Sequence, residues 1–127
     1  MNHGFAFVLM VFCHIVDDYY LQGILAKLKQ RDWWKANAPQ KLYRLDYLMA
    51  MAMHAYSWAF MIMLPWAIQL RFSPDLFYFV FLAINAAVHF AIDDLKANRK
   101  MINLSEDQTA HLLQIVITWA AMTEVIP

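Results

Sequence analysis

The sequence predicts an all-α fold, an integral membrane four-helix bundle that is antiparallel, with an interfacial amphipathic segment between helices one and two. Of its 127 residues, 62% are hydrophobic and only 16% are charged, whereas an ordinary soluble domain is about 45–50% apolar and about 25% charged. Several stretches approach the roughly 20 apolar residues that a spanning helix needs. A soluble bundle would need a polar outer face on every helix, and two of these stretches have none.

We expect one transmembrane domain over residues 1–127, with spanning helices at about residues 4–24, 46–70, 75–95 and 106–126. The first reaches sufficient length only when it includes residues 17–21. The second and third contain the runs YLMAMAMHAYSWAFMIMLPWAIQL and LFYFVFLAINAAVHFAI, each with one histidine and no charged residue. The fourth begins with a helix-start pattern in which Ser105 is the expected N-cap and Gln108 follows three residues later.

The basic residues predict how this bundle is oriented. Nine of the ten Lys and Arg residues lie in two loops, at about residues 25–45 and 96–105. The positive-inside rule places both loops in the cytoplasm and both termini outside it. Trp33 and Trp34 among the lysines indicate either an amphipathic helix in the headgroup layer or a solvated basic loop. The spans contain no GxxxG pattern, and a homo-oligomer is left open.

The composition excludes other classes of function. Ten basic and ten acidic residues give a formal net charge of zero, so no nucleic acid is expected to bind through global charge. The single cysteine, Cys13, excludes a disulfide scaffold and a CxxC motif. Only two glycines are present, and they form no phosphate-binding loop.

Histidine and aspartate recur four residues apart inside the expected spans. The pairs are His14 with Asp18, His89 with Asp93 and, in reversed order, Asp107 with His111. Because residues four apart share a helix face and the fourth helix runs opposite to the first and third, every pair places its carboxylate toward the cytoplasm and its imidazole about 6 Å deeper. His54 on the second helix reaches a similar depth. Asp17 and Asp94 point about 100° away from their paired neighbours and are expected to face water or a loop lysine.

The three pairs and His54, seven side chains in all, predict a site for a divalent metal. Imidazole and carboxylate ligands suit zinc first, with iron or manganese as alternatives, and the set could hold one ion or two. Such a site would support hydrolysis at the cytoplasmic face, with Asp18, Asp93 or Asp107 as a ligand or catalytic base. Lys96 is expected either to bind an anionic or phosphate-bearing substrate or to snorkel and set topology. Gln22 and Gln108 are further hydrogen-bonding candidates.

Two functions of other classes stay open at this point. A metal or proton transport or relay protein would need polar residues in the outer half of the bundle, where Asn85, Gln114 and Thr118 are available but no charged residue lies deep. A non-catalytic membrane interaction protein, such as a phage exclusion or anti-defence factor, would use its polar core only to fix helix register.

The order and spacing of these motifs resemble domain-of-unknown-function family 3307, which comprises small multi-spanning membrane proteins of bacteria and their phages. The resemblance is carried by His14-Ile-Val-Asp-Asp18-Tyr-Tyr-Leu-Gln22, His54, His89-Phe-Ala-Ile-Asp93-Asp-Leu-Lys96 and Asp107-Gln108-Thr-Ala-His111. It implies a bacterial inner membrane protein, or a host membrane protein if phage-encoded. It also favours Asp18 over Asp17, because the family pattern looks like H-x-x-G-D-F-x-L-Q and Asp17 stands at its glycine. The family is distantly similar to membrane-bound metal-dependent hydrolases, which implies hydrolase activity. For a hydrolase at this site we expect a phosphoester or lipid-like substrate.

Overall fold

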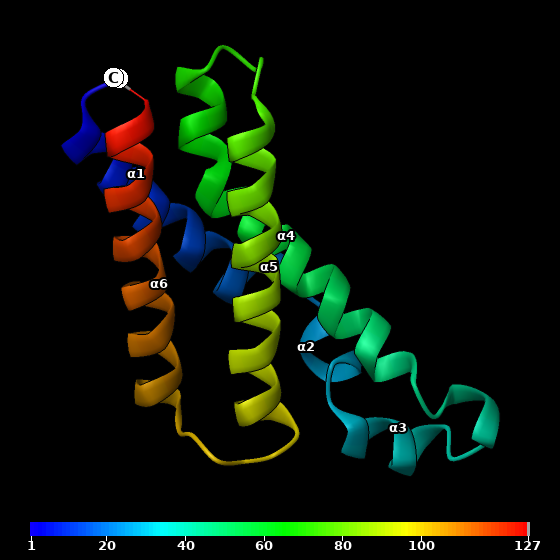
Figure 1. Ribbon diagram of the computed structural model, residues 1–127. Coiled ribbons are helices and arrows are strands. Elements are labelled where there is room, and N and C mark those ends of the chain that lie inside the picture. The colour runs from blue at the N-terminus through cyan, green and yellow to red at the C-terminus, as the bar shows by residue number, and fades with distance from the viewer. Residues whose placement is uncertain (127) are drawn as a thin grey trace.

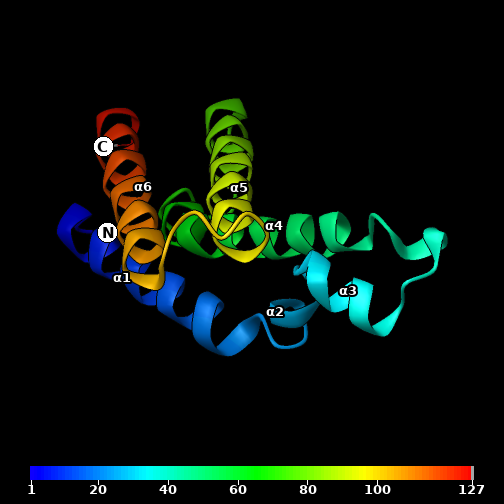
Figure 2. The same ribbon diagram turned by 90° about the horizontal axis from the view of Figure 1, so that it is seen from below.

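The computed structural model describes residues 1–126, and every regular element in that range is a helix, which confirms the all-α class. In chain order the elements are α1 (His3–Val16), the π-helix η1 (Asp17–Leu21), α2 (Leu25–Leu28), α3 (Arg31–Asn37), the 3-10 turn η2 (Lys41–Tyr43), α4 (Asp46–Gln69), α5 (Leu76–Ala97) and α6 (Leu104–Val125). The four long helices pack in the cyclic order α1, α4, α5, α6. Both chain ends lie at one end of the molecule (Figure 1). Seen from below, α1 and α4 form one layer and α5 and α6 form a second (Figure 2).

Three segments are long and apolar enough to cross a membrane, namely residues His3–Leu21, Lys41–Gln69 and Leu76–Ala97. α6 has the same length as α5, 22 residues, which corresponds to about 33 Å of helix. It is more polar than α5 because, beside the three charged residues that each helix contains, it carries more uncharged polar residues, such as Gln108, Thr109 and Thr118. The three apolar segments agree with the first three expected spans, and the fourth differs from them in composition rather than in length.

The distribution of polarity is the reverse of that in a soluble bundle. Large apolar side chains cover the outside, among them Phe12 on α1, Met49 on α4 and Ile117 on α6, each more than half exposed. Apolar residues also fill the interior near the chain termini, where Met10, Trp66, Ile115 and Met122 are fully buried. Toward the opposite end, the buried side chains include a cluster that is polar or charged. Its members are His14, Asp17, Asp18, His54, His89, Asp93, Asp107 and His111.

The end of the first span departs from the sequence expectation of one α-helix over residues 4–24. α1 ends at Val16 and continues as the π-helical turn η1, in which the N–H of Gln22 donates to the carbonyl of Asp17, five residues back, at 3.0 Å. A π-helical turn inserts an extra residue into the helical repeat and occurs often at functional sites. Because of this wider turn, Asp17 and Asp18 are both buried. The expectation that Asp17 faces water or a loop lysine is therefore wrong.

The start of α6 also differs from the sequence expectation. The N-cap is Asn103 rather than Ser105, because Asn103 and Glu106 form a reciprocal capping box with hydrogen bonds of 3.0 and 2.8 Å. The helix consequently begins at Leu104 instead of about residue 106. Glu106 is the acidic residue of this capping box, and Gln108 points toward the buried acidic side chains.

The segment between η1 and α4 folds into two short helices rather than an extended loop. Gly23 adopts a positive φ of 49° in the turn after η1, a conformation that glycine reaches without steric cost. In α3, the expected amphipathic segment, Trp33 and Trp34 are half-buried and their rings lie 5.2 Å apart. The indole N–H of Trp34 donates to the carbonyl of Leu28 at 2.7 Å, which ties α3 to α2.

Contacts with the end of α5 hold this segment against the bundle. Asn98 accepts a hydrogen bond from the backbone N–H of Arg31 at 2.8 Å and donates one to the carbonyl of Lys29 at 3.2 Å. The Lys100 ammonium lies 3.1 Å from the Asp32 carboxylate and lowers the pKa of that exposed group. These contacts bring Lys29 next to α5, although 64 positions separate it from its partner there.

Candidate metal centre

The three His/Asp pairs are in contact, as their spacing predicts. The nitrogen–oxygen distances are 3.5 Å for His14 and Asp18, 3.8 Å for His89 and Asp93, and 3.3 Å for His111 and Asp107. Each histidine of these pairs is at most 2% exposed. The pairs come from α1 with η1, from α5 and from α6, so the ring of helices directs all three toward one place.

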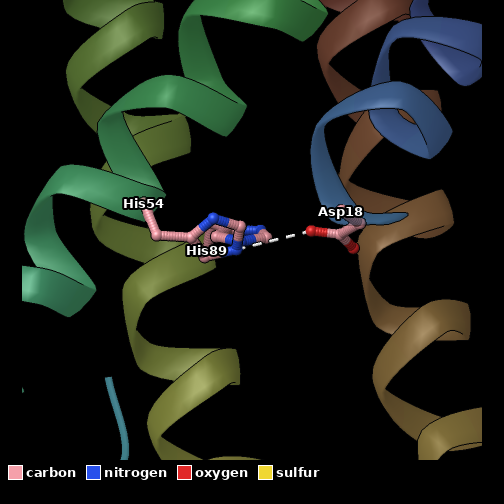
Figure 3. A group of neighbouring side chains, drawn as sticks. All are labelled: Asp18, His54 and His89. Atoms are coloured by element: carbon pink, nitrogen blue, oxygen red, sulfur yellow. Dashed lines mark hydrogen bonds and ion pairs between the residues drawn. The ribbon is translucent and has the colours of Figure 1, made fainter. Parts of the chain in front are cut away.

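His54 on α4 brings the first group of candidate ligand atoms together. Its Nε2 lies 3.2 Å from Nε2 of His89 and 3.4 Å from Oδ1 of Asp18. Figure 3 shows the two imidazole rings on one side and the Asp18 carboxylate pointing at them from the other. Oδ2 of Asp93 is also 3.4 Å from the same His54 nitrogen. Three elements thus place donor atoms around one point, and α5 supplies two of them.

A second group of candidate ligand atoms surrounds His111. Its Nε2 lies 3.5 Å from Oδ1 of Asp93 and 3.3 Å from Oδ1 of Asp107. The ring of His111 stacks on that of His89, with centroids 4.2 Å apart. Asp93 therefore faces both groups, one oxygen toward His54 and the other toward His111. His89 also belongs to both groups, but its Nε2 offers only one lone pair, so it can serve one ion at a time.

The donor atoms fit a divalent ion in kind and in spacing. Two ligands at 2.0–2.1 Å from a tetrahedral zinc ion stand about 3.3–3.4 Å apart, and the contacts made by His54 Nε2 are 3.2–3.4 Å. Nε2 of His111 and Oδ1 of Asp107 are buried, and neither forms a hydrogen bond with another described residue. A cation between these converging buried atoms would satisfy them. The described His and Asp groups could therefore hold a metal ion.

The indole ring of Trp58 packs against the imidazoles, a role that sequence reasoning missed. It is fully buried on α4 and stacks on His89 with centroids 4.2 Å apart and an interplanar angle of 18°. Its indole N–H donates to Nδ1 of His14 at 2.8 Å. The proton of a neutral His14 then sits on Nε2, so this ring has no free lone pair for an ion. His14, expected to be a ligand, lies beside the two groups rather than within them. The available signal was spacing, since Trp58 follows His54 by four residues.

Asp17 lies behind His54. Its Oδ2 is 3.6 Å from Nδ1 of His54, and its Oδ1 accepts a hydrogen bond from Ser57 at 2.6 Å. Both Asp17 and His54 are fully buried. Neither atom of this 3.6 Å contact has a hydrogen bond among the described residues. A carboxylate this close to Nδ1 favours a proton on that nitrogen and leaves the Nε2 lone pair directed at the first group, and carboxylates support many metal-binding histidines from this side.

Two lysines approach the acidic side chains from the loop end. Lys96 lies 2.6 Å from Oδ2 of Asp107, and Lys29 lies 2.6 Å from Oδ2 of Asp93. Lys96 was a candidate from the sequence, and here its ammonium is half of an ion pair. Lys29, only 14% exposed in its side chain, was one of six basic residues in its loop and carried no signal that singled it out.

A polar cavity connects this centre to the loop end of the bundle. The inner cavity has a volume of about 100 Å³, and its lining includes the paired groups Lys29 with Asp93 and Lys96 with Asp107. It shares these two lysines and Gln22 with a larger mouth cavity of about 380 Å³.

Both predicted glutamines line the inner cavity. The Gln108 amide donates to Asp18 at 3.3 Å and to Asp107 at 3.0 Å, and that of Gln22 donates to the Asp18 backbone carbonyl.

A separate cluster of buried polar residues lies between α5 and α6. Gln114 and Thr118 donate to the Asn85 side-chain oxygen at 2.8 and 3.0 Å. This cluster is hydrogen-bonded across the two helices, as interhelical polar contacts are.

One family matches the chain, that described as "Protein of unknown function (DUF3307)", over residues 6–127. The chain belongs to this family. The match confirms the resemblance based on the His/Asp motifs, and it spans all of the helices that contribute to the two groups. No curated protein and no solved structure matches the chain. The DUF3307 description names no activity, so the geometry of the centre carries the functional argument.

Proposed function

We propose that this chain is an integral membrane protein with four antiparallel spans, α1 with η1, α4, α5 and α6. The apolar outer surface and polar interior support this proposal, because lipid solvates the former and not the latter. α6 qualifies as the fourth span although it is the more polar helix. Its polar residues Asp107, His111 and Gln114 are buried, whereas Leu113 and Ile117 are about 60% exposed.

The charge distribution sets the proposed orientation. The basic segment before α4 and the basic end of α5 lie on the same side as the metal centre, and Arg71 alone lies in the turn at the other end. The positive-inside rule makes the side with the metal centre cytoplasmic and places both termini outside the cytoplasm. The membrane would be the inner membrane of a bacterium or of a phage host. The centre then opens toward the cytoplasm through the inner and mouth cavities.

We further propose that the centre binds one or two divalent ions, zinc first, and that the protein is a metal-dependent hydrolase. The observation that carries this proposal is the convergence of His54, His89, His111 and the carboxylates of Asp18, Asp93 and Asp107 beside a polar cavity. A divalent ion at such a site supplies Lewis-acid activation of water and of a phosphoryl or carbonyl oxygen. With two ions, Asp93 would bridge them, because its two oxygens face different groups.

The surrounding residues have separate proposed roles in hydrolysis. Asp107 and Asp18 line the inner cavity beside Gln108, so either carboxylate is placed to accept a proton from water. Lys29 and Lys96 stand at the junction of the inner and mouth cavities, where their ammonium groups can hold an anionic substrate. The water attacks the ester, and the departing alcohol takes a proton from the same aqueous cavity.

Elemental analysis of detergent-purified protein tests the metal proposal. Wild type is measured beside His89→Ala and Asp93→Ala, with Asp94→Ala as the matched control because Asp94 pairs with Arg99 outside the centre. We expect one or two equivalents of zinc, iron or manganese in the wild type and the control, and less than a tenth of that in the two site variants. Wild-type protein without metal, prepared without chelator, would instead support a proton relay or a structural polar core.

A further inference from the structure

A groove on the outer face of the bundle lies beside the candidate metal centre. It lies between α1 with η1 and α6, has a volume of about 550 Å³ and is lined by Val11, His14, Ile15, Tyr19, Tyr20, Gln108 and Leu112. We call it the α1/α6 groove. Its volume lies in the range of about 300–1,000 Å³ that is usual for small-molecule sites.

The chemical character of the groove changes along its length. Val11, Ile15 and Tyr19 recur every four residues, so they form one continuous stripe along α1 and η1. Leu112 faces them from α6, one helical turn beyond Gln108. Ile15 and Leu112 are each more than 40% exposed, so the wide part of the groove opens on the surface that we assign to lipid. The more buried part of the lining is polar, because His14 is 2% exposed and Gln108 is half-buried.

The groove adjoins the inner cavity. Tyr19 and Gln108 line both of them. The Gln108 amide donates to Asp18 and Asp107, so the residue that separates groove from cavity also contacts two carboxylates of the centre. An apolar chain in the groove and a polar group in the inner cavity could therefore belong to a single molecule.

The charge of the inner cavity indicates which polar group that molecule carries. Three carboxylates and two ammonium groups line the cavity and leave it with one excess negative charge. A divalent ion reverses the balance to one excess positive charge. The metal-loaded cavity then favours an anion, and Lys29 and Lys96 offer donors suited to phosphate oxygens.

We propose that the substrate is a membrane lipid with a phosphate headgroup, seated with one acyl chain in the α1/α6 groove and its phosphate in the inner cavity. This inference rests on the proposed metal centre, because the excess positive charge depends on the ion. The lipid enters sideways from the cytoplasmic leaflet, and the mouth cavity connects the headgroup to water. A soluble phosphomonoester shares the headgroup chemistry but would make no use of the groove.

Lipid binding to detergent-purified, zinc-loaded protein tests this inference. Native mass spectrometry counts bound phosphatidic acid, with phosphatidylcholine as the comparison lipid and inorganic phosphate as the soluble competitor. Leu112→Trp fills the groove. Leu113→Trp is the matched control, because Leu113 lies next in sequence and lines a separate groove of about 320 Å³ between α5 and α6. Metal content and helicity are measured on every sample, and Ile15→Trp repeats the test from the opposite wall.

We expect wild type and Leu113→Trp to bind one phosphatidic acid in preference to phosphatidylcholine. Leu112→Trp and Ile15→Trp should weaken that binding at least tenfold while retaining their metal. Unchanged lipid binding in both groove variants would overturn the inference. It would also be overturned if millimolar phosphate displaced the lipid to the same extent from every variant. Groove-dependent lipid binding by protein that takes up no zinc would refute the proposed metal centre, and with it the charge argument for a phosphate headgroup, and would leave only the groove as an acyl-chain site.

Discussion

The ion pair between Asp93 and Lys29 allows metal binding to be separated from structural support. The two charged atoms are 2.6 Å apart, and the exposed fractions of the two side chains are only 5% and 14%. Asp93→Asn removes the negative charge and leaves the Lys29 ammonium without its partner. Removing one member of a buried pair costs about 3–5 kcal/mol. Because Lys29 retains some access to water, we expect a loss of about 3 kcal/mol in unfolding free energy.

The single variant Lys29→Met should cost less, because Asp93 keeps His54 and His111 within 3.5 Å. In the double variant both charges are gone, and replacing a buried pair by uncharged groups is often close to neutral. The double variant should therefore regain stability to within about 1 kcal/mol of wild type. Its metal content should nevertheless match that of Asp93→Asn, below a tenth of wild type, whereas Lys29→Met should keep its metal.

Equilibrium unfolding in mixed detergent micelles measures these stabilities, with chelator present so that bound metal does not contribute. Elemental analysis of the same four proteins, purified without chelator, measures occupancy. Full metal occupancy in the double variant would refute Asp93 as a ligand. A loss of unfolding free energy below 1 kcal/mol in Asp93→Asn would show that leaving Lys29 without its partner has no buried-charge cost.

Substitutions at three further positions probe the surroundings of the centre. Trp58→Ala should cost about 3–5 kcal/mol in unfolding free energy through loss of a buried ring, whereas Trp58→Phe should cost about 1–3 kcal/mol because His14 loses its hydrogen-bond donor. Asp17→Asn should weaken zinc affinity about 10–100-fold, measured by competition with a chromophoric chelator. Equal zinc affinity in Asp17→Asn and the control Asp94→Asn would show that Asp17 does not support His54 as a metal ligand. Asn85→Leu should lower unfolding free energy by about 1–2 kcal/mol with unchanged metal content, and a loss of metal there would contradict the separation of the two polar clusters.

Much of the centre follows from local helix geometry. The pairs His14 with Asp18, His89 with Asp93 and Asp107 with His111 contact each other because backbone hydrogen bonding in a helix fixes the direction of residues four apart. The same rule would have found Trp58, which lies four residues after His54, had aromatic residues been included with the titratable ones.

Other features depend on contacts between distant segments. Asp17 turns inward because the π-helical turn widens the end of α1, and its partners Ser57 and His54 lie on another helix. Lys29 reaches Asp93 because Asn98 holds the loop against α5. Neither arrangement has a periodic signature, so residue spacing contains no trace of them.

Side-chain type and the fixed helical repeat were enough to predict that the chain is helical, that its long segments are apolar and which histidines and aspartates share a face. Which atoms meet depends on the tertiary structure. It directed Nδ1 of His14 to Trp58, placed Nε2 of His54 beside three other donors and divided the Asp93 oxygens between two groups. These outcomes depend on how the helices cross, which no spacing within one helix can specify.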